Sequence, residues 1–342
     1  MVAKIIAEMA WAHDGDLSKA KSILSSAKRA GADFFGIHVT SLVDYMVPFY
    51  GSGEGRVSEG KDTGDIFGYL SSINLSNDDW VDLRNYAKSI DIPLCVMPND
   101  IQSMEFIEKK MKPESFVIAA SAFCEYPLIN RIASQNRQTF LRIGGASLGE
   151  VENVIEIFRE IGNRKIVLLH GYQNYPTKIE NSNISYMRTL KDMFGLPVGL
   201  ADHIDGASPL SEILPILALP FGAEFIEKHI TFDRSEKGED FEAALDEEGF
   251  SRFVGNVRAA EIALGSPHWL GFTEGEEKYR KVSRKRVVAA AAIASGTVIE
   301  DKHLAFKRAD EGFELQFVDQ ITGRKTNQDL SKDQAITDEV LL

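Results

Sequence analysis

The sequence contains little cysteine, with only Cys95 and Cys124 in 342 residues. Two cysteines in apolar surroundings make no disulfide framework, and we expect both to be reduced core residues. Long apolar runs are lacking too, so no segment is predicted to cross a bilayer. The chain opens on the strand-like run Ile5-Ile6-Ala7, without the layout of a signal peptide. We therefore expect a cytoplasmic protein.

Positive charge is also scarce. The chain has 38 Lys and Arg residues against 51 Asp and Glu residues, which gives a formal net charge of -13. This charge argues against nucleic acid or an anionic membrane as a partner, because both would repel it. Hydrophobic residues make up 44% and charged residues 26% of the chain, as in soluble globular proteins. The length is enough for a large core and more than one domain.

Short apolar runs alternate with amphipathic helical patterns over most of the chain. Eight predicted strands cover residues 4–8, 33–39, 93–97, 116–119, 139–143, 165–170, 197–200 and 223–229. Eight strand–helix units over this length predict a (β/α)8 TIM barrel in residues 1–265. A doubly wound open sheet is the alternative, but the turn after the first strand, 11–15, is not rich in glycine.

Three segments depart from this alternation. Residues 40–73 show no clear strand or helix pattern, and we expect this long connection to form part of the substrate site. Residues 266–283 are predicted to be an extended linker, and residues 284–342 a small β-rich domain. A basic run at 278–286 is either a solvated surface or a docking contact with an acidic partner subunit.

Two histidines, His203 and His229, follow short apolar runs near the ends of the seventh and eighth predicted strands. In a barrel of parallel strands, the chemistry collects at these ends. Two imidazoles from neighbouring strands can hold one divalent metal ion and leave positions open for substrate and water. Two hydrogen-bonded core histidines are the alternative. Because Glu8 and Asp240 stand at comparable strand ends, we favour the metal site.

Further motifs stand in a specific order and spacing along the chain. They are Ile6-Ala7-Glu8 with His13-Asp14-Gly15, Leu168-Leu169-His170 with Tyr175-Pro176-Thr177, Asp202-His203, Ile226-Glu227-Lys228-His229, Gly238-Glu239-Asp240 and the C-terminal 286–308. With these motifs the sequence resembles the sialic acid (N-acetylneuraminate) synthase family. That resemblance implies a metal-dependent barrel followed by a small antifreeze-like (SAF) domain. It also implies condensation of phosphoenolpyruvate with an N-acylmannosamine-type sugar aldehyde, and a domain-exchanged homodimer.

The resemblance also implies roles for individual residues. His203 and His229 match the metal ligands, with Mn or Mg as the expected ion and Zn less favoured. Glu8, Asp240 and Glu227 are the catalytic candidates, although Asp240 and Glu239 equally fit a solvated acidic loop. Tyr175 and Asp240 match sugar-contacting positions, and Gln173, a further substrate-binding candidate, stands where the family has an asparagine. Arg308 matches an arginine that the C-terminal domain offers to the site of a neighbouring subunit.

The sequence departs from the family where phosphoenolpyruvate binds. Apolar or small residues replace lysines and hydroxyl-bearing residues at Gly36, Val96, Met97, Val117, Ala120, Ala122 and Ala201. Each lost charge-assisted contact is worth roughly 1.5–3 kcal/mol. We expect phosphoenolpyruvate to bind weakly or not at all in the family's usual pose. Arg142 and His38 would supply a differently placed anion site, while an outer-wall salt bridge is the alternative for Arg142.

Three functions therefore remain open at this point. The leading one is a metal-dependent synthase that joins phosphoenolpyruvate to an acylamino sugar aldehyde, giving a nonulosonic acid. The second keeps the metal and the sugar but not phosphoenolpyruvate, as in an aldolase, a lyase or a related sugar-modifying enzyme. The third is a non-catalytic sugar-binding homologue, and the retention of Glu8, Asp240 and both histidines argues against it.

Overall fold

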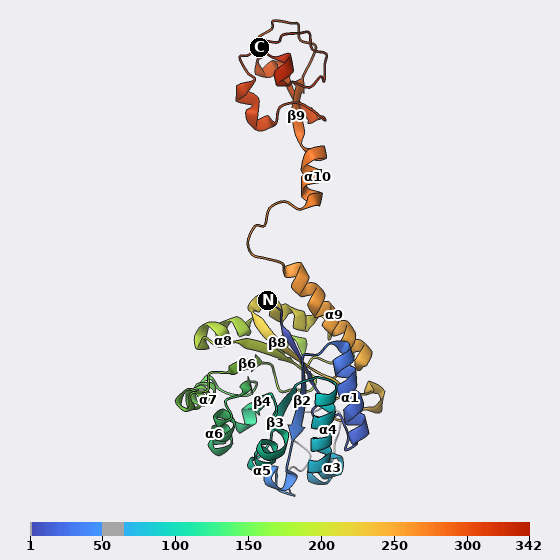
Figure 1. Ribbon diagram of the computed structural model, residues 1–342, viewed down its shortest axis with the longest axis vertical. Coiled ribbons are helices and arrows are strands. Elements are labelled where there is room, and N and C mark those ends of the chain that lie inside the picture. Colours follow the sequence, from blue (N-terminus) through green and yellow to red (C-terminus); the bar gives the residue numbers. More distant parts are fainter. Residues whose placement is uncertain (1, 50–64) are drawn as a thin grey trace. The chain divides into compact units, whose positions relative to one another are not determined.

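A computed structural model describes residues 2–49 and 65–342 of the chain. The chain divides into two compact units, Met1–Gly265 and Ser266–Leu342 (Figure 1). The first unit contains the strands and helices on which the candidate site is built. The second unit is small and has a hydrophobic core of its own.

The first unit is a closed barrel of eight parallel strands in the order β1 to β8. The strands are β1 (Lys4–Glu8), β2 (Phe34–Val39), β3 (Leu94–Pro98), β4 (Ser115–Ala119), β5 (Gln138–Arg142), β6 (Ile166–His170), β7 (Val198–Asp202) and β8 (Ala223–His229). Pairing of β1 with β8, with Glu8 opposite His229, closes the barrel. The predicted TIM barrel is thus confirmed, and the open doubly wound sheet is excluded.

Helices surround the barrel (Figure 1). They are α1 (Leu17–Ala30), α2 (Leu42–Tyr45), α3 (Ile66–Ile73), α4 (Asn77–Ser89), α5 (Ile101–Phe106), α6 (Tyr126–Ser134), α7 (Leu148–Ile161), α8 (Tyr186–Phe194) and α9 (Glu247–Leu264). Side-chain caps fix where they begin: Asp16 accepts from the backbone of α1, and Ser147 forms a capping box with Glu150 on α7. Among the residues that the structure describes, no helix is long and apolar enough to span a membrane.

Successive side chains of a strand point to opposite faces, which gives each barrel strand an inward and an outward set. The inward set forms a small core of Ile6, Cys95, Met97, Val117, Phe140, Val167, Leu169, Ala201 and Phe225, with Phe34 and Ala119 packed against it. Its rings Phe140 and Phe225 meet edge to face with centroids 4.8 Å apart. Glu8, Arg142 and Glu227 each follow an inward residue by two positions, so they point toward the barrel axis.

Two segments expected to lack regular structure contain helices. The connection 40–73 includes α2 and α3, and the predicted linker 266–283 includes α10 (Glu274–Ser283). A capping box between Thr273 and Glu276 begins α10, and the expectation of an extended linker did not take this short signal into account. The central part of the connection, residues 50–64, lies outside the described residues.

The cysteine prediction was half right. Cys95 is buried on β3, as expected, whereas Cys124 is exposed. Cys124 lies in the short loop between β4 and α6, and its thiol contacts Glu150 at 3.8 Å. Apolar neighbours in sequence did not predict burial here, because a connecting loop can turn such a residue to the surface.

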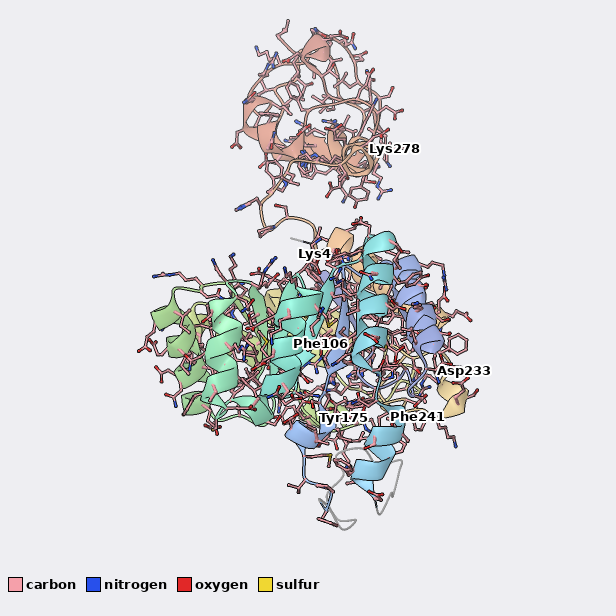
Figure 2. All side chains as sticks on the ribbon, turned by 60° about the horizontal axis from the view of Figure 1, so that its bottom comes forward. Lys4, Phe106, Tyr175, Asp233, Phe241 and Lys278 are labelled. Atoms are coloured by element: carbon pink, nitrogen blue, oxygen red, sulfur yellow. The ribbon has the colours of Figure 1, made fainter. Side chains whose placement is uncertain are left out.

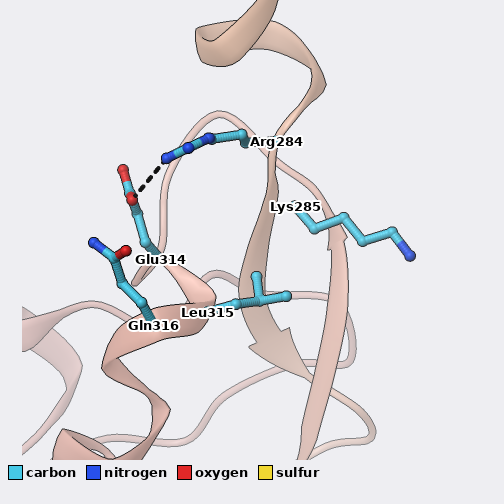
Figure 3. A pocket seen from close by; sticks show the side chains of 5 residues that line it. All are labelled: Arg284, Lys285, Glu314, Leu315 and Gln316. Atoms are coloured by element: carbon cyan, nitrogen blue, oxygen red, sulfur yellow. Dashed lines mark hydrogen bonds and ion pairs between the residues drawn. The ribbon is translucent and has the colours of Figure 1, made fainter.

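The second unit has a two-stranded antiparallel sheet of β9 (Lys285–Ala289) and β10 (Leu304–Arg308). Val287, Ile293, Ile299 and Ile321 are among the residues of its core. At its surface, Arg284, Lys285, Glu314, Leu315 and Gln316 line a hollow of about 380 Å³ (Figure 3). Arg284 pairs there with Glu314 at 3.2 Å, so basic residues of the run 278–286 have partners within their own unit.

Candidate functional site

The candidate site lies at the C-terminal ends of the barrel strands. Tyr175 and Phe241 lie at the end of the barrel opposite Lys4, which begins β1 (Figure 2). His203 directly follows β7, and His229 is the last residue of β8. Their ring centroids are 5.2 Å apart, and both side chains are buried. Neighbouring strands thus bring the two predicted metal ligands together.

One nitrogen of each histidine ring has no hydrogen-bond partner within the described part of the chain. His203 Nδ1 donates to the carbonyl oxygen of Tyr172 at 2.6 Å, which places the free electron pair on Nε2. The Nε2 atoms of His203 and His229 are both buried without a hydrogen-bond partner. Burial lowers the pKa of His203 to about 3 and that of His229 well below its usual value, and nearby Arg142 contributes to both shifts.

Neutral imidazoles with unpartnered Nε2 atoms are the form that binds a metal ion. The pair therefore fits the expected divalent ion, with His203 oriented from behind by the Tyr172 carbonyl. Within residues 2–49 and 65–342, no group of three or more His, Cys, Asp or Glu side chains is arranged to hold an ion. Water or substrate would have to complete the coordination.

Tyr175 lies beside the histidine pair. Its ring centroid is 4.5 Å from that of His203 and 5.6 Å from that of His229. Its hydroxyl donates to Gln173 Oε1 at 2.9 Å. Burial raises the pKa of Tyr175, and the nearby Asp240 raises it further, so the phenol keeps its proton. The two predicted substrate-binding residues on this loop therefore meet next to the predicted metal ligands.

A buried ionic cluster lies inside the barrel. The guanidinium of Arg142 pairs through Nη2 with Glu8 and, at 2.9 Å, with Glu227 Oε2. Arg142 Nε donates to the same Glu227 oxygen at 3.2 Å, and the Ala10 amide donates to Glu8 Oε1 at 2.8 Å. Arg142 therefore points into the barrel, and the outer-wall salt bridge considered for it is wrong.

Burial raises the proton affinity of both carboxyl groups in this cluster, and Glu8 adds to the effect at Glu227. Burial raises the pKa of Glu227 and of Glu8, while Arg142 partly offsets the increase in both. His38 contacts the cluster, with its Nε2 3.3 Å from Arg142 Nη1 and 3.4 Å from Glu8 Oε1. Burial and the nearby guanidinium hold the pKa of His38 well below its usual value, so this histidine is neutral.

Asp240 reaches the site from a loop and not from a strand end, contrary to the sequence-based expectation. It lies eleven residues beyond the end of β8, in a turn where its φ is 60°. The pKa of Asp240 is raised to about 8, mainly by burial. Repulsion from Glu239, Glu242 and Glu8 adds to the increase. Tyr69 of α3 donates to Glu239 at 2.8 Å, so part of the long 40–73 connection contacts this loop.

Arg308 belongs to the second unit. It is the last residue of β10, and its side chain is exposed. Its expected place in the site of a neighbouring subunit stays a prediction.

Sequence reasoning missed three features of the site. The close approach of Glu8 to Gly36 is one: a Cβ atom at Gly36 would lie 2.3 Å from Glu8 Oε2, so the glycine leaves room for the carboxylate. The second is the Tyr172 carbonyl, which accepts the hydrogen bond of His203. A backbone acceptor cannot be predicted from the type of its side chain. The third is the buried pair of Lys228 and Asp202 at 2.5 Å. Side chains alternate between the two faces of β8, so Lys228 points outward while its neighbours Glu227 and His229 point inward. This outward direction could have been predicted from the sequence.

Comparison with known proteins agrees with this architecture. The NeuB family model matches residues 23–268, and the SAF domain model matches residues 284–342. An N,N'-diacetyllegionaminic acid synthase of Legionella pneumophila is 30% identical over 97% of this chain and 92% of its own. An uncharacterized protein of Methanocaldococcus jannaschii is also 30% identical, with the same coverage. The crystal structure of an N-acetylneuraminic acid synthetase from Leptospira borgpetersenii, in complex with citrate, is 25% identical. It has a TM-score of 0.69 and covers 82% of this chain and 92% of its own.

Proposed function

The chain belongs to the NeuB family, a sugar-biosynthesis family of sialic acid synthase type, and we propose that it forms a carbon–carbon bond at the carbonyl carbon of an open-chain acylamino sugar. In the form suggested by its relatives, phosphoenolpyruvate would be the carbon nucleophile and a nonulosonic acid the product. We propose a cytoplasmic enzyme with a divalent metal ion, Mn or Mg, held by His203 and His229.

One observation carries this proposal: two buried, neutral imidazoles share a site with their Nε2 atoms free of protein partners. Leaving two buried acceptors unsatisfied costs stability, and a bound ion would recover it. When bound, such an ion supplies Lewis-acid polarisation of the sugar's carbonyl oxygen. The neutral form of both rings over the physiological range keeps them competent as ligands.

The chain's own side chains supply the remaining functions. Tyr175 and Gln173 present a phenol and an amide beside the histidines, which suits hydrogen bonding to sugar hydroxyls. Asp240, with its pKa raised to about 8, holds a proton near neutral pH and can donate it to an oxygen of the substrate. Glu8 is fixed by the Ala10 amide and by Arg142, so it presents a carboxyl group of defined orientation.

The test is product formation by the Mn-loaded protein. N-acylmannosamines would be incubated with phosphoenolpyruvate or with pyruvate, and the condensed 2-oxo sugar acid would be sought by mass spectrometry. We expect product from wild type and none from His203→Ala or His229→Ala. His268→Ala, at an exposed position, is the matched control and should retain full activity. Binding of sugar without any product would instead favour the non-catalytic homologue.

We further propose a domain-exchanged homodimer in which Arg308 of one subunit completes the site of the other. The exposed guanidinium of Arg308 is available for such a contact. Arg308→Ala should remain folded and dimeric in light scattering but lose turnover or sugar affinity. A monomeric wild-type protein in solution, or an unchanged Arg308→Ala enzyme, would contradict this arrangement.

A further inference from the structure

Lys228 and Asp202 form an ion pair on the outward face of strands β7 and β8. The Lys228 ammonium donates to Asp202 Oδ2 at 2.5 Å, and the two side chains are 0% and 4% exposed. The neighbours two positions away on the same face, Ile226, Ile230 and Leu200, are buried and apolar. A charged pair is therefore enclosed in the apolar layer that lies between these strands and the helices around them.

Stability alone does not account for such a pair. Taking two charges out of water costs free energy that their mutual attraction often fails to recover, so apolar side chains of similar volume would stabilise the fold as well or better. An ion pair differs from apolar packing in its directionality, because each N–H group must point at its acceptor at hydrogen-bond distance. The pair therefore fixes the relative positions of the two backbones that carry it.

The backbones that this pair joins also carry the two candidate metal ligands. Asp202 directly precedes His203, and Lys228 directly precedes His229. The last matched pair in the register of β7 on β8 is Asp202 with Lys228. Lys228 also donates to the carbonyl oxygen of Ile204 at 3.3 Å, so one ammonium group holds both residues that flank His203.

The other contacts of His203 come from the loop after β6. The Tyr172 carbonyl orients its ring, and the Thr177 amide donates to its carbonyl oxygen at 2.7 Å. Neither of these two bonds involves β8, so neither fixes how far His203 lies from the ligand on that strand. The side chain of Lys228 links the two strands at this level.

We propose that Lys228, together with Asp202, is a positioning residue that sets the spacing of the His203 and His229 rings, and thereby the affinity of the site for its divalent ion. This role rests on the metal ion of the proposed function. The ring centroids are 5.2 Å apart, and with two imidazoles as protein ligands, tight binding requires both Nε2 atoms to reach one ion at once. The pair acts from behind, because its side chains point to the face of the sheet opposite the two rings.

Calorimetric titration of the metal-free, full-length protein with Mn²⁺ tests this role. Lys228→Met keeps most of the side-chain volume but removes the donor that links the strands. We expect Mn²⁺ to bind this variant about tenfold to a hundredfold more weakly than wild type, as is typical when a group that orients a metal ligand is lost. An unchanged Kd in the folded variant would overturn the inference.

A double variant separates positioning from stability. Lys228→Met alone leaves Asp202 buried without its partner, so a weakened fold would also lower the affinity. Lys228→Met/Asp202→Val removes both charges, and its urea midpoint should recover most of the loss, whereas its Mn²⁺ affinity should stay at least about tenfold below that of wild type. Recovery of the affinity together with the stability would show that the pair is merely structural and would contradict the positioning role.

Pulsed electron paramagnetic resonance of the bound Mn²⁺ gives a readout that does not depend on stability. At saturating Mn²⁺, the spectrum should show coupling to two imidazole nitrogens in wild type and to one in Lys228→Met. Two equally strong couplings in this variant would count against the inference, even if the double variant does not fold.

Arg131→Met is the matched control. It removes a cation that pairs with Glu105 at 3.0 Å and with Glu108 at 2.8 Å, on helices away from β7 and β8. The Kd for Mn²⁺ and the spectrum should both remain as in wild type. A change as large as that in Lys228→Met would show that the site responds to any lost ion pair, and the special role of Lys228 would be lost.

Failure of this inference and failure of the proposed function are distinguishable. If Mn²⁺ binds wild type through both histidines but binds Lys228→Met equally well, the positioning role fails and the metal site stands. If Mn²⁺ binds as expected in every variant but wild type forms no condensed product, the proposed function fails and the positioning role stands.

Discussion

Glu8 and Arg142, on opposite sides of the barrel interior at β1 and β5, form a fully buried ion pair. Their side chains are 1% and 3% exposed, and Glu227 shares the same guanidinium nitrogen. Two carboxyl groups and one cation in a closed space are held together by charge, so the position of each depends on the other two. This mutual dependence makes the cluster sensitive to a change at any one of its members.

The first prediction concerns Arg142→Met, which keeps much of the side-chain volume but removes the charge. It leaves Glu8 and Glu227 buried without their partner, so the free energy of unfolding should fall by about 3–5 kcal/mol. Urea denaturation measures this loss. Arg159→Met, which breaks the exposed pair with Glu156, should cost less than about 1 kcal/mol. Equal losses in the two variants would show that the cluster is not held by Arg142.

A second prediction addresses the space beside Glu8. In Gly36→Ala, the added Cβ would lie 2.3 Å from Glu8 Oε2, so the carboxylate must move away from Arg142. The free energy of unfolding should fall by about 1–3 kcal/mol, because an extra methyl group is forced into a packed interior. The matched control is Gly149→Ala on α7, where nothing lies within 4 Å of the new Cβ. That change should stabilise the protein by about 0.5–1 kcal/mol, since alanine favours the helix.

The alternation of short apolar runs with helical patterns predicted the barrel well, because strands that are buried on both faces stand out in the sequence as apolar runs. The runs 4–8 and 223–229 match β1 and β8 at both ends, and the other strands shift by one or two residues. Side-chain alternation also carries site information, since it turns Glu227 and His229 inward and Lys228 outward. A strand's own sequence therefore specifies which of its polar residues face the axis.

What the sequence did not predict depends on atoms brought together from distant positions. The engagement of Arg142 by Glu8 and Glu227 joins three strands, and no local pattern encodes it. Asp240 was expected at a strand end, yet it lies in a loop that is held over the barrel by contacts such as Tyr69 with Glu239. The orientation of His203 depends on a backbone carbonyl at Tyr172, which any residue type would provide.

The third prediction concerns metal binding itself. Mn²⁺ should stabilise the barrel unit, by about 2.7 kcal/mol when its concentration is a hundredfold above Kd, because a ligand of the folded state shifts the unfolding equilibrium. Thermal unfolding with and without the ion measures this gain. It should be lost in both His203→Ala and His229→Ala but retained in His268→Ala. A gain that survives both histidine substitutions would locate the ion elsewhere.

The fourth prediction concerns the pH dependence of stability at His13, which lies between β1 and α1. Its Nδ1 accepts from the Gly15 amide at 3.1 Å, and its ring packs edge-on against Trp80 with centroids 5.4 Å apart. Burial lowers its pKa in the folded state from 6.5 to about 4. The unfolded chain therefore binds a proton at a higher pH than the folded protein does. The stability that the neutral ring contributes is complete above pH 6.5 and is lost as the pH falls toward 4.

Each pH unit of this window corresponds to about 1.4 kcal/mol, so the loss at His13 approaches about 3 kcal/mol at pH 4. His13→Gln keeps an acceptor for the Gly15 amide but has no titrating group. The difference between the free energies of unfolding of wild type and His13→Gln should therefore shrink by about this amount between pH 7 and pH 4. Urea denaturation at a series of pH values measures it. Because the other buried histidines titrate in both proteins, a difference that does not change with pH would show that His13 takes up its proton equally well in the folded state.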